Sequence, residues 1–280
     1  MQPQEGTIEV DIETSTTCSA ACRFCPYPKY AHWRAGETMD MDLFRKIIDE
    51  LATIPQVHDV RLNGLNEPLL DRHLDARYSY IHNKGGRFTS TLTTHGVYLS
   101  PKRVESLVAA GVQKFIISLN GSNAEEHEAQ MGLKGKFDIV CANIQYCIDR
   151  GLDVEVRGVV NDDIFPMKSG MELVKRWGWK RYGGHVKLIR ELNWAGENRT
   201  IRTFDPDSCC VRAVANIFIR WDGVITTCCV DPTGAGYQFG DLKTQTIREA
   251  YNSPEYTNFR EQHSLNKAAQ FPICQNCTRG

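Results

Sequence analysis

Hydrophobic residues recur along the first two thirds of the chain with two alternating periods, one typical of strands and one typical of helices. Period-two alternation or short apolar runs predict strands over 7–13, 57–64, 87–94, 112–120, 152–160 and 184–190. Helical spacing lies between them, over 41–51, 71–83, 101–111, 137–151 and 167–178. We therefore expect an α/β fold in which parallel strands are joined by right-handed helical crossovers.

Local signals support these boundaries. Asp40 stands where an N-cap would precede the helix over 41–51, and Pro101 and Gly111 open and close another helix. The alternation suits either a partial α/β barrel or an open doubly wound sheet. In both architectures reactive groups gather where strands lead into helices.

The alternation stops near residue 191, and we predict a domain boundary near 205. The two domains would cover 1–204 and 205–280. Within the second, the segment IFIRWDGVITTCC predicts a β-hairpin with Asp222 and Gly223 at its turn.

Composition narrows the function classes. The 280 residues are 41% hydrophobic, with a formal net charge of −1 and no Lys/Arg-rich block. This balance argues against a nucleic-acid or anionic-membrane partner and favours a small molecule or a peptide. No apolar segment reaches membrane-spanning length and the start of the chain is acidic, so we expect a cytoplasmic protein without a membrane partner.

Eleven cysteines are many for a cytoplasmic chain, and they point to metal or redox chemistry. Cys18, Cys22 and Cys25 form a C-x3-C-x2-C run directly after the first predicted strand. Three thiolates can hold three corners of a [4Fe–4S] cluster and leave the fourth iron open. A zinc site with His32 as a fourth ligand and a set of uncoordinated thiols are the alternatives.

The same loop reads CSAACRFC, with the aromatic Phe24 just before the last cysteine, and it resembles the hallmark of the radical S-adenosylmethionine (SAM) enzymes. The resemblance implies a partial (β/α)6 barrel whose open iron is chelated by SAM. It also implies cleavage of SAM to a 5′-deoxyadenosyl radical, fed by an external one-electron donor such as flavodoxin or ferredoxin.

Other strand ends extend the resemblance. The turn Gly64-Leu65-Asn66-Glu67-Pro68 is similar to the family's Gly-Gly-Glu-Pro turn, with Asn66 in place of a glycine. The third and fourth strand ends are also similar, with an imidazole or an amide at positions where relatives carry other polar groups. The SAM contacts that the resemblance implies are Phe24, Asn66, Glu67, Thr93, His95, Ser118, Asn120 and Arg157.

The tail contains a second cysteine pattern, C-x12-G-x4-C…C-x2-C, formed by Cys210, Gly223, Cys228, Cys274 and Cys277. Four thiolates in this pattern can enclose an iron–sulfur cluster or zinc. The pattern resembles the SPASM and shorter twitch proteins, which implies an auxiliary [4Fe–4S] cluster. Cys209 could replace Cys210 and Cys229 could replace Cys228, so each doublet stays open. Cys141 and Cys147 fit the buried face of a helix.

The clusters together favour one reaction. A fully ligated auxiliary cluster would move an electron, and the architecture resembles dehydrogenases that act on aminocyclitols in aminoglycoside pathways. Oxidation of a C–OH or C–NH2 carbon in a small sugar-like or cyclitol-like substrate is therefore the leading hypothesis, with Arg190 as the candidate for substrate binding or proton acceptance.

Three alternatives remain. The first is an epimerase in which Cys209 or Cys229 gives a hydrogen atom to the substrate radical. A peptide-modifying enzyme ranks below it, because the first strand begins by residue 7 and leaves no room ahead of it for a peptide-recognition domain. The last is a metal-binding module without catalytic activity.

Overall fold

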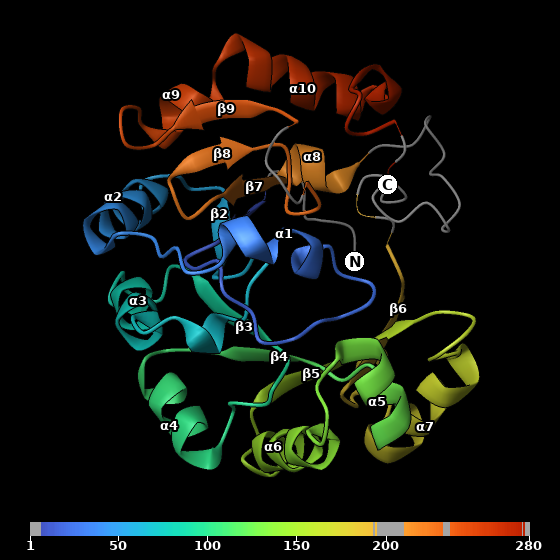
Figure 1. The fold of residues 1–280 in the computed structure, drawn as a ribbon. Coiled ribbons are helices and arrows are strands. Elements are labelled where there is room, and N and C mark those ends of the chain that lie inside the picture. Colours follow the sequence, from blue (N-terminus) through green and yellow to red (C-terminus); the bar gives the residue numbers. More distant parts are fainter. Residues whose placement is uncertain (1–6, 193, 195–209, 232–235, 276, 278–280) are drawn as a thin grey trace.

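The computed structural model describes residues 7–192, 194, 210–231, 236–275 and 277. Within them, a single sheet has the strand order β6-β5-β4-β3-β2-β1-β7-β8-β9 (Figure 1). All six predicted strands are present and pair in parallel with their chain neighbours: β1 (Ile8–Ile12), β2 (Val57–Arg61), β3 (Thr89–Thr94), β4 (Lys114–Ser118), β5 (Asp153–Val160) and β6 (Val186–Arg190). The sheet curves as an open barrel, because the other edge of β1 pairs with β7 instead of β6.

Helices cover the outside of this sheet (Figure 1). The five predicted ones are α2 (Met41–Leu51), α3 (Leu74–His82), α4 (Pro101–Ala109), α6 (Phe137–Asp149) and α7 (Met167–Trp177). The pattern did not predict α1 (Tyr27–Arg34) and α5 (Ala124–Met131), nor the short 3-10 turns η1 (Pro68–Leu70) and η2 (Lys180–Tyr182). Among the described residues, no helix combines the length and the apolar composition needed to cross a membrane.

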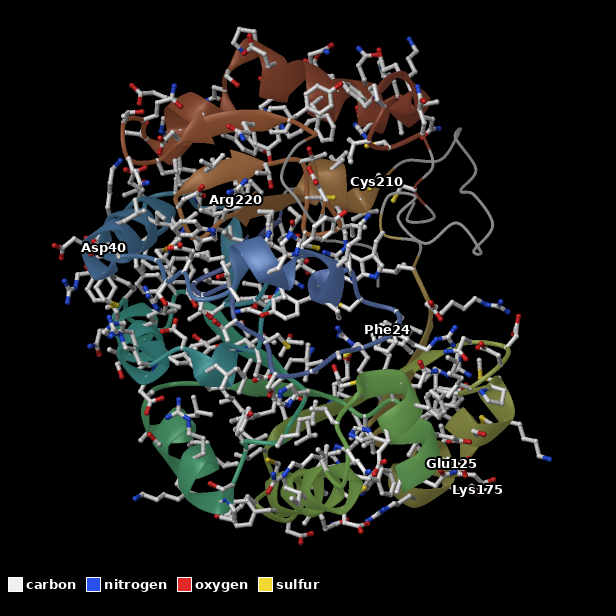
Figure 2. All side chains as sticks on the ribbon, in the orientation of Figure 1. Phe24, Asp40, Glu125, Lys175, Cys210 and Arg220 are labelled. Atoms are coloured by element: carbon white, nitrogen blue, oxygen red, sulfur yellow. The ribbon has the colours of Figure 1, made fainter. Side chains whose placement is uncertain are left out.

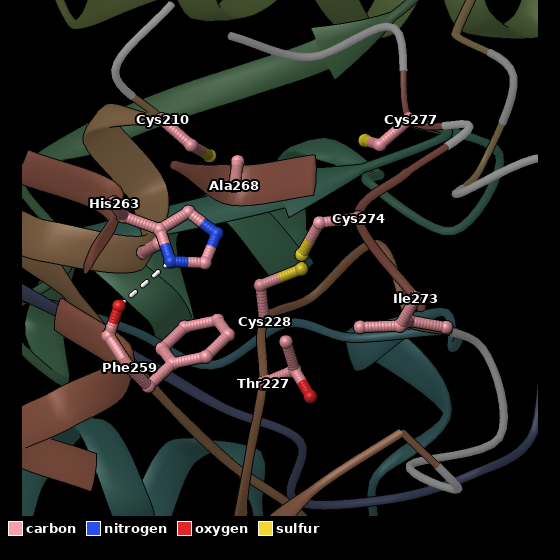
Figure 3. Close-up of a pocket in the computed structure, with 10 residues that line it drawn as sticks. Cys210, Thr227, Cys228, Phe259, His263, Ala268, Ile273, Cys274 and Cys277 are labelled. Atoms are coloured by element: carbon pink, nitrogen blue, oxygen red, sulfur yellow. Dashed lines mark hydrogen bonds between the residues drawn. The ribbon is translucent and has the colours of Figure 1, made fainter. Parts of the chain in front are cut away.

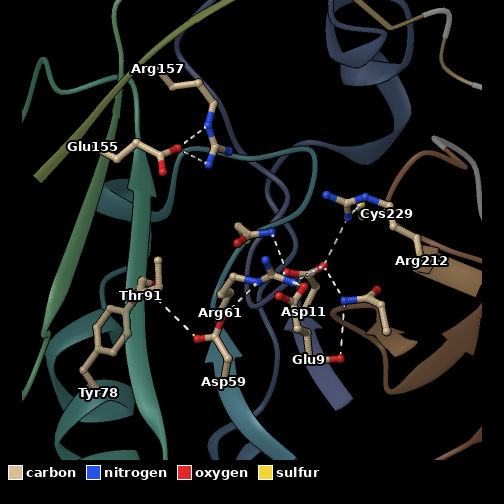
Figure 4. Close-up of polar contacts among 12 residues, drawn as sticks. Glu9, Asp11, Asp59, Arg61, Tyr78, Thr91, Glu155, Arg157, Arg212 and Cys229 are labelled. Atoms are coloured by element: carbon tan, nitrogen blue, oxygen red, sulfur yellow. Dashed lines mark hydrogen bonds and ion pairs between the residues drawn. The ribbon is translucent and has the colours of Figure 1, made fainter. Parts of the chain in front are cut away.

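The two faces of the barrel strands differ in chemistry. Alternate residues such as Val10, Ile12 and Val156 are fully buried against the helices, in a core shared with Phe44 and Ile144. Because side chains alternate along a strand, the residues between them face the inside of the barrel. The inner face carries charged and hydroxyl side chains, including Glu9, Asp11, Asp59, Arg61, Thr91, Glu155 and Arg157 (Figure 4).

The tail continues the same sheet. Its elements are α8 (Val211–Ala215), β7 (Asn216–Ile219), β8 (Val224–Thr226), β9 (Gln238–Asp241), α9 (Ile247–Tyr251), α10 (Pro254–Ser264) and η3 (Ala268–Gln270). The predicted hairpin is confirmed: β7 and β8 pair antiparallel, and Gly223 takes a φ of +86° at the turn, where a side chain would be strained. Strand β7 also pairs in parallel with β1, so the tail is docked on the barrel by backbone hydrogen bonds. The predicted boundary near 205 lies outside the described residues.

Candidate active site and auxiliary metal centre

The opening thiols lie in the loop between β1 and α1, at the carboxyl end of the barrel strands. Helix α5 supports this loop, because the backbone N–H groups of Ala21 and Arg23 donate hydrogen bonds to the carbonyls of Met131 and Gln130, both at a distance of 3.0 Å. Phe24 packs with Met131 in a small apolar cluster beside the thiols. The unpredicted helix therefore holds one side of the cysteine loop by hydrogen bonds.

Burial dominates the chemistry of these three thiols. It raises the pKa of Cys18 to about 12 and that of Cys25 to about 11, and it raises the pKa of Cys22 well above its usual value. Mutual repulsion adds to the effect of burial at Cys18 and Cys22. Three partly buried sulfurs that repel one another as anions fit a metal centre that supplies the missing positive charge.

Glu67 connects the ends of two strands to the cysteine loop. Its carboxylate is 1% exposed and accepts hydrogen bonds from Thr94 Oγ1 at 2.7 Å and from the His95 N–H at 2.9 Å. Its own N–H donates to the Thr17 carbonyl at 2.9 Å, and His95 Nε2 lies 3.1 Å from Ser19 Oγ. The predicted SAM contacts Glu67 and His95 thus lie together, and they share hydrogen bonds with the loop that carries the thiols.

The turn before Glu67 is closed by Asn66. Its Oδ1 accepts from the Gly64 N–H at 2.9 Å, and its Nδ2 donates to Ser15 Oγ at 3.1 Å. Gly64 packs directly on Glu13: a Cβ there would lie 2.6 Å from Glu13 Oε1. Glu13 in turn forms a buried ion pair with Arg34, with Oε1 and Nη2 2.5 Å apart. Sequence reasoning missed this pair, although Glu13 continues the acidic alternation of the first strand.

The fourth and fifth strands bring three more predicted residues together. Ser118 and Arg157 are paired neighbours on β4 and β5, and Arg157 Nε donates to Glu155 Oε1 at 2.9 Å. Asn120 is 1% exposed, and its Oδ1 accepts from the Val159 N–H at 2.7 Å, so its amide binds strand β5. Thr93 is on the same face of the sheet, paired with Ile116, which precedes Ser118 on β4 by two residues.

Arg190 does not lie with these residues. It pairs with Val160 at the end of β6, and Val160 faces Gly170 of helix α7. Arg157 pairs with Lys187, which precedes Arg190 on β6 by three residues. Because side chains alternate along a strand, Arg157 and Arg190 lie on opposite faces of the sheet. The Arg190 side chain is therefore exposed on the helix-covered face, whereas Arg157 faces the inside of the barrel.

Four tail cysteines line one cavity: Cys210, Cys228, Cys274 and Cys277 (Figure 3). Cys210 caps the start of α8 (Figure 2), Cys228 follows β8, and the other two share a turn near the end of the chain. Two buried polar atoms without a hydrogen-bond partner among the described residues, His263 Nε2 and Thr227 Oγ1, belong to lining residues. The donor set suits an iron–sulfur group. In the described part of the chain, no three His, Cys, Asp or Glu side chains are preformed around a single ion.

The second cysteine doublet is divided between two environments. Cys228 lines the tail cavity, whereas Cys229 Sγ accepts a hydrogen bond from Arg212 Nη1 at 2.6 Å (Figure 4). Arg212 Nη1 also lies 3.7 Å from Asp11 Oδ2 on β1. Cys229 therefore points toward the barrel. The alternative Cys209 lies outside the described residues, as do 195–208.

The Arg212–Asp11 contact belongs to a polar network inside the barrel, which the sequence analysis did not predict. Asp11 is 1% exposed and is contacted by Arg61 Nε at 2.8 Å, Asn63 Nδ2 at 3.2 Å and Asn216 Nδ2 at 3.0 Å. Arg61 ends β2, Asn63 follows that strand and Asn216 begins β7, so the partners lie on both sides of β1. The alternation of Glu9, Asp11 and Glu13 could have indicated an acidic inner face, but not its partners.

Comparison with known proteins gives matches to two domain families. Residues 12–168 match the radical SAM superfamily, and residues 209–278 match the SPASM iron–sulfur cluster-binding domain.

Individual relatives are distant in sequence. The chain is 21% identical, over 96% of its length and 91% of the relative's, to the S-adenosyl-L-methionine-dependent 2-deoxy-scyllo-inosamine dehydrogenase of Niallia circulans. It is 29% identical to an AdoMet-dependent heme synthase of Methanosarcina barkeri, over 63% of this chain and about half (49%) of that protein. The crystal structure of BtrN in complex with AdoMet and 2-DOIA superposes with a TM-score of 0.69 at 20% identity, covering 100% of this chain and 95% of BtrN. That likeness shows a shared fold.

Proposed function

This chain belongs to the radical SAM superfamily, and we propose that it oxidises a carbon bearing a hydroxyl or amino group in a small polar, cyclitol-like substrate. It is an enzyme that uses SAM and a [4Fe–4S] cluster, and its C-terminal SPASM region binds auxiliary iron–sulfur. The observation that carries the proposal is the convergence of four tail thiols on one cavity, since this set leaves no coordination position for substrate. Alignment with a dehydrogenase over nearly the whole of both chains supports it.

When bound, the cofactors supply a hydrogen-abstracting radical and an acceptor for one electron. The chain's own task is to hold them and to shape the space between them. In our proposal Cys18, Cys22 and Cys25 hold the first cluster and leave one iron for SAM. Glu67 keeps His95 and the cysteine loop in register through its hydrogen bonds.

Oxidation of a C–OH carbon to a ketone removes one hydrogen atom, one proton and one electron. A guanidinium does not accept a proton near neutral pH, and Arg190 lies on the helix-covered face, so we assign it neither proton acceptance nor substrate binding. We propose Glu191 for the proton. Its N–H continues the ladder to the Val160 carbonyl at 3.2 Å, so it follows Arg190 on the opposite, barrel-facing side.

The contact between Cys229 and Arg212 supports oxidation over epimerisation. A thiol that gives up a hydrogen atom must keep its S–H bond, whereas a guanidinium that donates to the sulfur favours the anion. Of the two cysteines predicted as hydrogen-atom donors, Cys229 is the one within the described residues. Epimerisation therefore ranks as the second candidate function.

The test uses the reconstituted enzyme with SAM, a reductant and a panel of aminocyclitols and amino sugars in D2O. We expect 5′-deoxyadenosine and a product two mass units lighter than its substrate, without solvent deuterium on carbon. A product carrying one deuterium at an inverted carbon would instead establish the epimerase. If 5′-deoxyadenosine is absent when the full iron content is present, the proposed reaction is wrong.

A further inference from the structure

His263 lines the tail cavity, and one of its ring nitrogens has no hydrogen-bond partner among the described residues. It lies near the end of α10 and is 0% exposed. Its Nδ1 is 2.7 Å from the Phe259 carbonyl oxygen, one helical turn earlier. A carbonyl oxygen can only accept, so Nδ1 carries the hydrogen and the neutral ring presents its lone pair at Nε2.

The ring is held in this orientation on two sides. The Phe259 ring lies 4.2 Å away between centroids, and the Phe271 ring is stacked on it at 5.0 Å with an interplanar angle of 16°. Nε2 is buried and has no hydrogen-bond partner among the described residues. Figure 3 shows the ring beside the cavity with its free nitrogen directed toward the cysteine sulfurs. A buried lone pair in a fixed ring calls for a partner in that cavity.

We propose that His263 Nε2 is a nitrogen ligand of the auxiliary iron–sulfur centre. The proposal rests on the assignment of the tail thiols as ligands and is independent of the substrate. An Nδ1–H bonded to a backbone carbonyl is the arrangement that fixes metal-binding histidines for coordination through Nε2. Five donors then surround four irons: Cys210, Cys228, Cys274, Cys277 and His263. One thiol is left beside the cluster as a neighbour.

The replacement of a thiolate by a neutral imidazole has a definite electronic consequence. Imidazole ligands raise the reduction potential of iron–sulfur clusters relative to thiolates, because they leave the cluster with less negative charge. The histidine would therefore make the auxiliary cluster a stronger electron acceptor than an all-cysteine cluster in the same pocket.

The experiment isolates the auxiliary cluster in the full chain by replacing Cys18, Cys22 and Cys25 with alanine. After anaerobic reconstitution and iron counting, the protein labelled with 15N-histidine is reduced and examined by pulsed electron paramagnetic resonance. We expect a strong 15N coupling of the size of a coordinated imidazole. It should disappear in His263→Phe and persist in His58→Gln, a change at an exposed histidine of β2.

Two further readouts sharpen the result. In His263→Phe the spare thiol should take the vacant position, so the iron content stays at about four while the midpoint potential falls. If the bulky ring prevents folding, His263→Ala gives the same comparison. A reduced cluster without strong histidine coupling would overturn the inference and leave the proposed function standing. Absence of tail iron in this background would overturn both.

Discussion

The two thiol sites of this molecule are assembled in opposite ways. The first uses one continuous loop, in which eight residues from Cys18 to Cys25 carry all three thiols. The second draws its thiols from three separate segments of the tail, which meet where α10 packs against α8, the helix that Cys210 precedes. A local loop with three thiols leaves a coordination position open, whereas a tertiary cavity can surround its occupant completely.

Their electrostatic surroundings differ as well. Burial is the main cause of the raised pKa of Cys18, and the nearby Glu67 carboxylate raises this pKa further. The tail site has the Arg212 guanidinium close to Cys229 and Cys228. An anion opposes the addition of an electron to a nearby cluster and a cation favours it. Each site also has a group of the opposite sign, Arg34 near Cys25 and Asp231 near Cys274, so the contrast is confined to Cys18 and to the Cys228–Cys229 doublet. There it agrees with the proposed roles, in which the first cluster gives an electron and the auxiliary cluster accepts one.

The strongest test of this comparison removes the local site altogether. Replacement of Cys18, Cys22 and Cys25 by alanine should reduce 5′-deoxyadenosine formation to background. It should also lower the iron content from about eight to about four per chain. Cys147→Ala, in the buried core of α6, is the control and should keep about eight. Loss of all iron in the triple variant would mean that the tail holds no iron–sulfur cluster of its own.

The second test divides the doublet of the tail site. Cys228→Ala should slow product formation while SAM cleavage continues, because it removes one of the thiols that line the cavity and leaves no spare donor there. Cys229→Ala should keep the full iron content, because in the native chain the Cys229 sulfur accepts a hydrogen bond from Arg212 and does not line the cavity. Iron analysis and 5′-deoxyadenosine assays on the two variants check this. The reverse pattern would exchange the roles of the two cysteines.

A smaller effect is expected from the positive charge of Arg212 beside the tail site. Arg212→Gln should lower the midpoint potential of the auxiliary cluster, by on the order of tens of millivolts, since a partly buried cation is removed beside it. Redox titration followed by electron paramagnetic resonance measures the shift. Arg248→Gln, an exposed position on α9, is the matched control. Equal potentials in both variants would show that Arg212 does not act on the cluster.

The same local and tertiary division explains what the sequence could predict. Six strands and five helices followed from apolar periodicity, and α2 has the predicted bounds. Helix α5 was missed because it buries His127, Gln130 and Met131, two of them polar, so its inward face has no apolar signature. The three-thiol loop was visible as a motif. The contact of Cys229 was not, because Arg212 lies in another element. The place of His263 beside the tail cavity was not either, because the cysteines that line this cavity come from other segments.

The weakest predicted effect concerns the support of the loop site by α5. His127 is 0% exposed, and neither ring nitrogen has a hydrogen-bond partner in the described part of the chain. Burial, with a smaller contribution from His95, lowers its pKa to about 4. Its folded-state pKa is thus below the unfolded value of about 6.5, so its contribution to stability is present above pH 6.5 and is lost as the pH falls toward 4.

Urea unfolding of the apoprotein at pH 7 and pH 5 measures this contribution. His127→Leu removes no hydrogen bond, so its free energy of unfolding at pH 7 should stay close to that of the native chain. At pH 5 the native chain should have lost more stability than the variant. His58→Gln, at an exposed site, should follow the native chain at both pH values. Equal losses in the native chain and in His127→Leu would mean that other groups cause the acid sensitivity, and that His127 is not a weak point in the support of the cysteine loop.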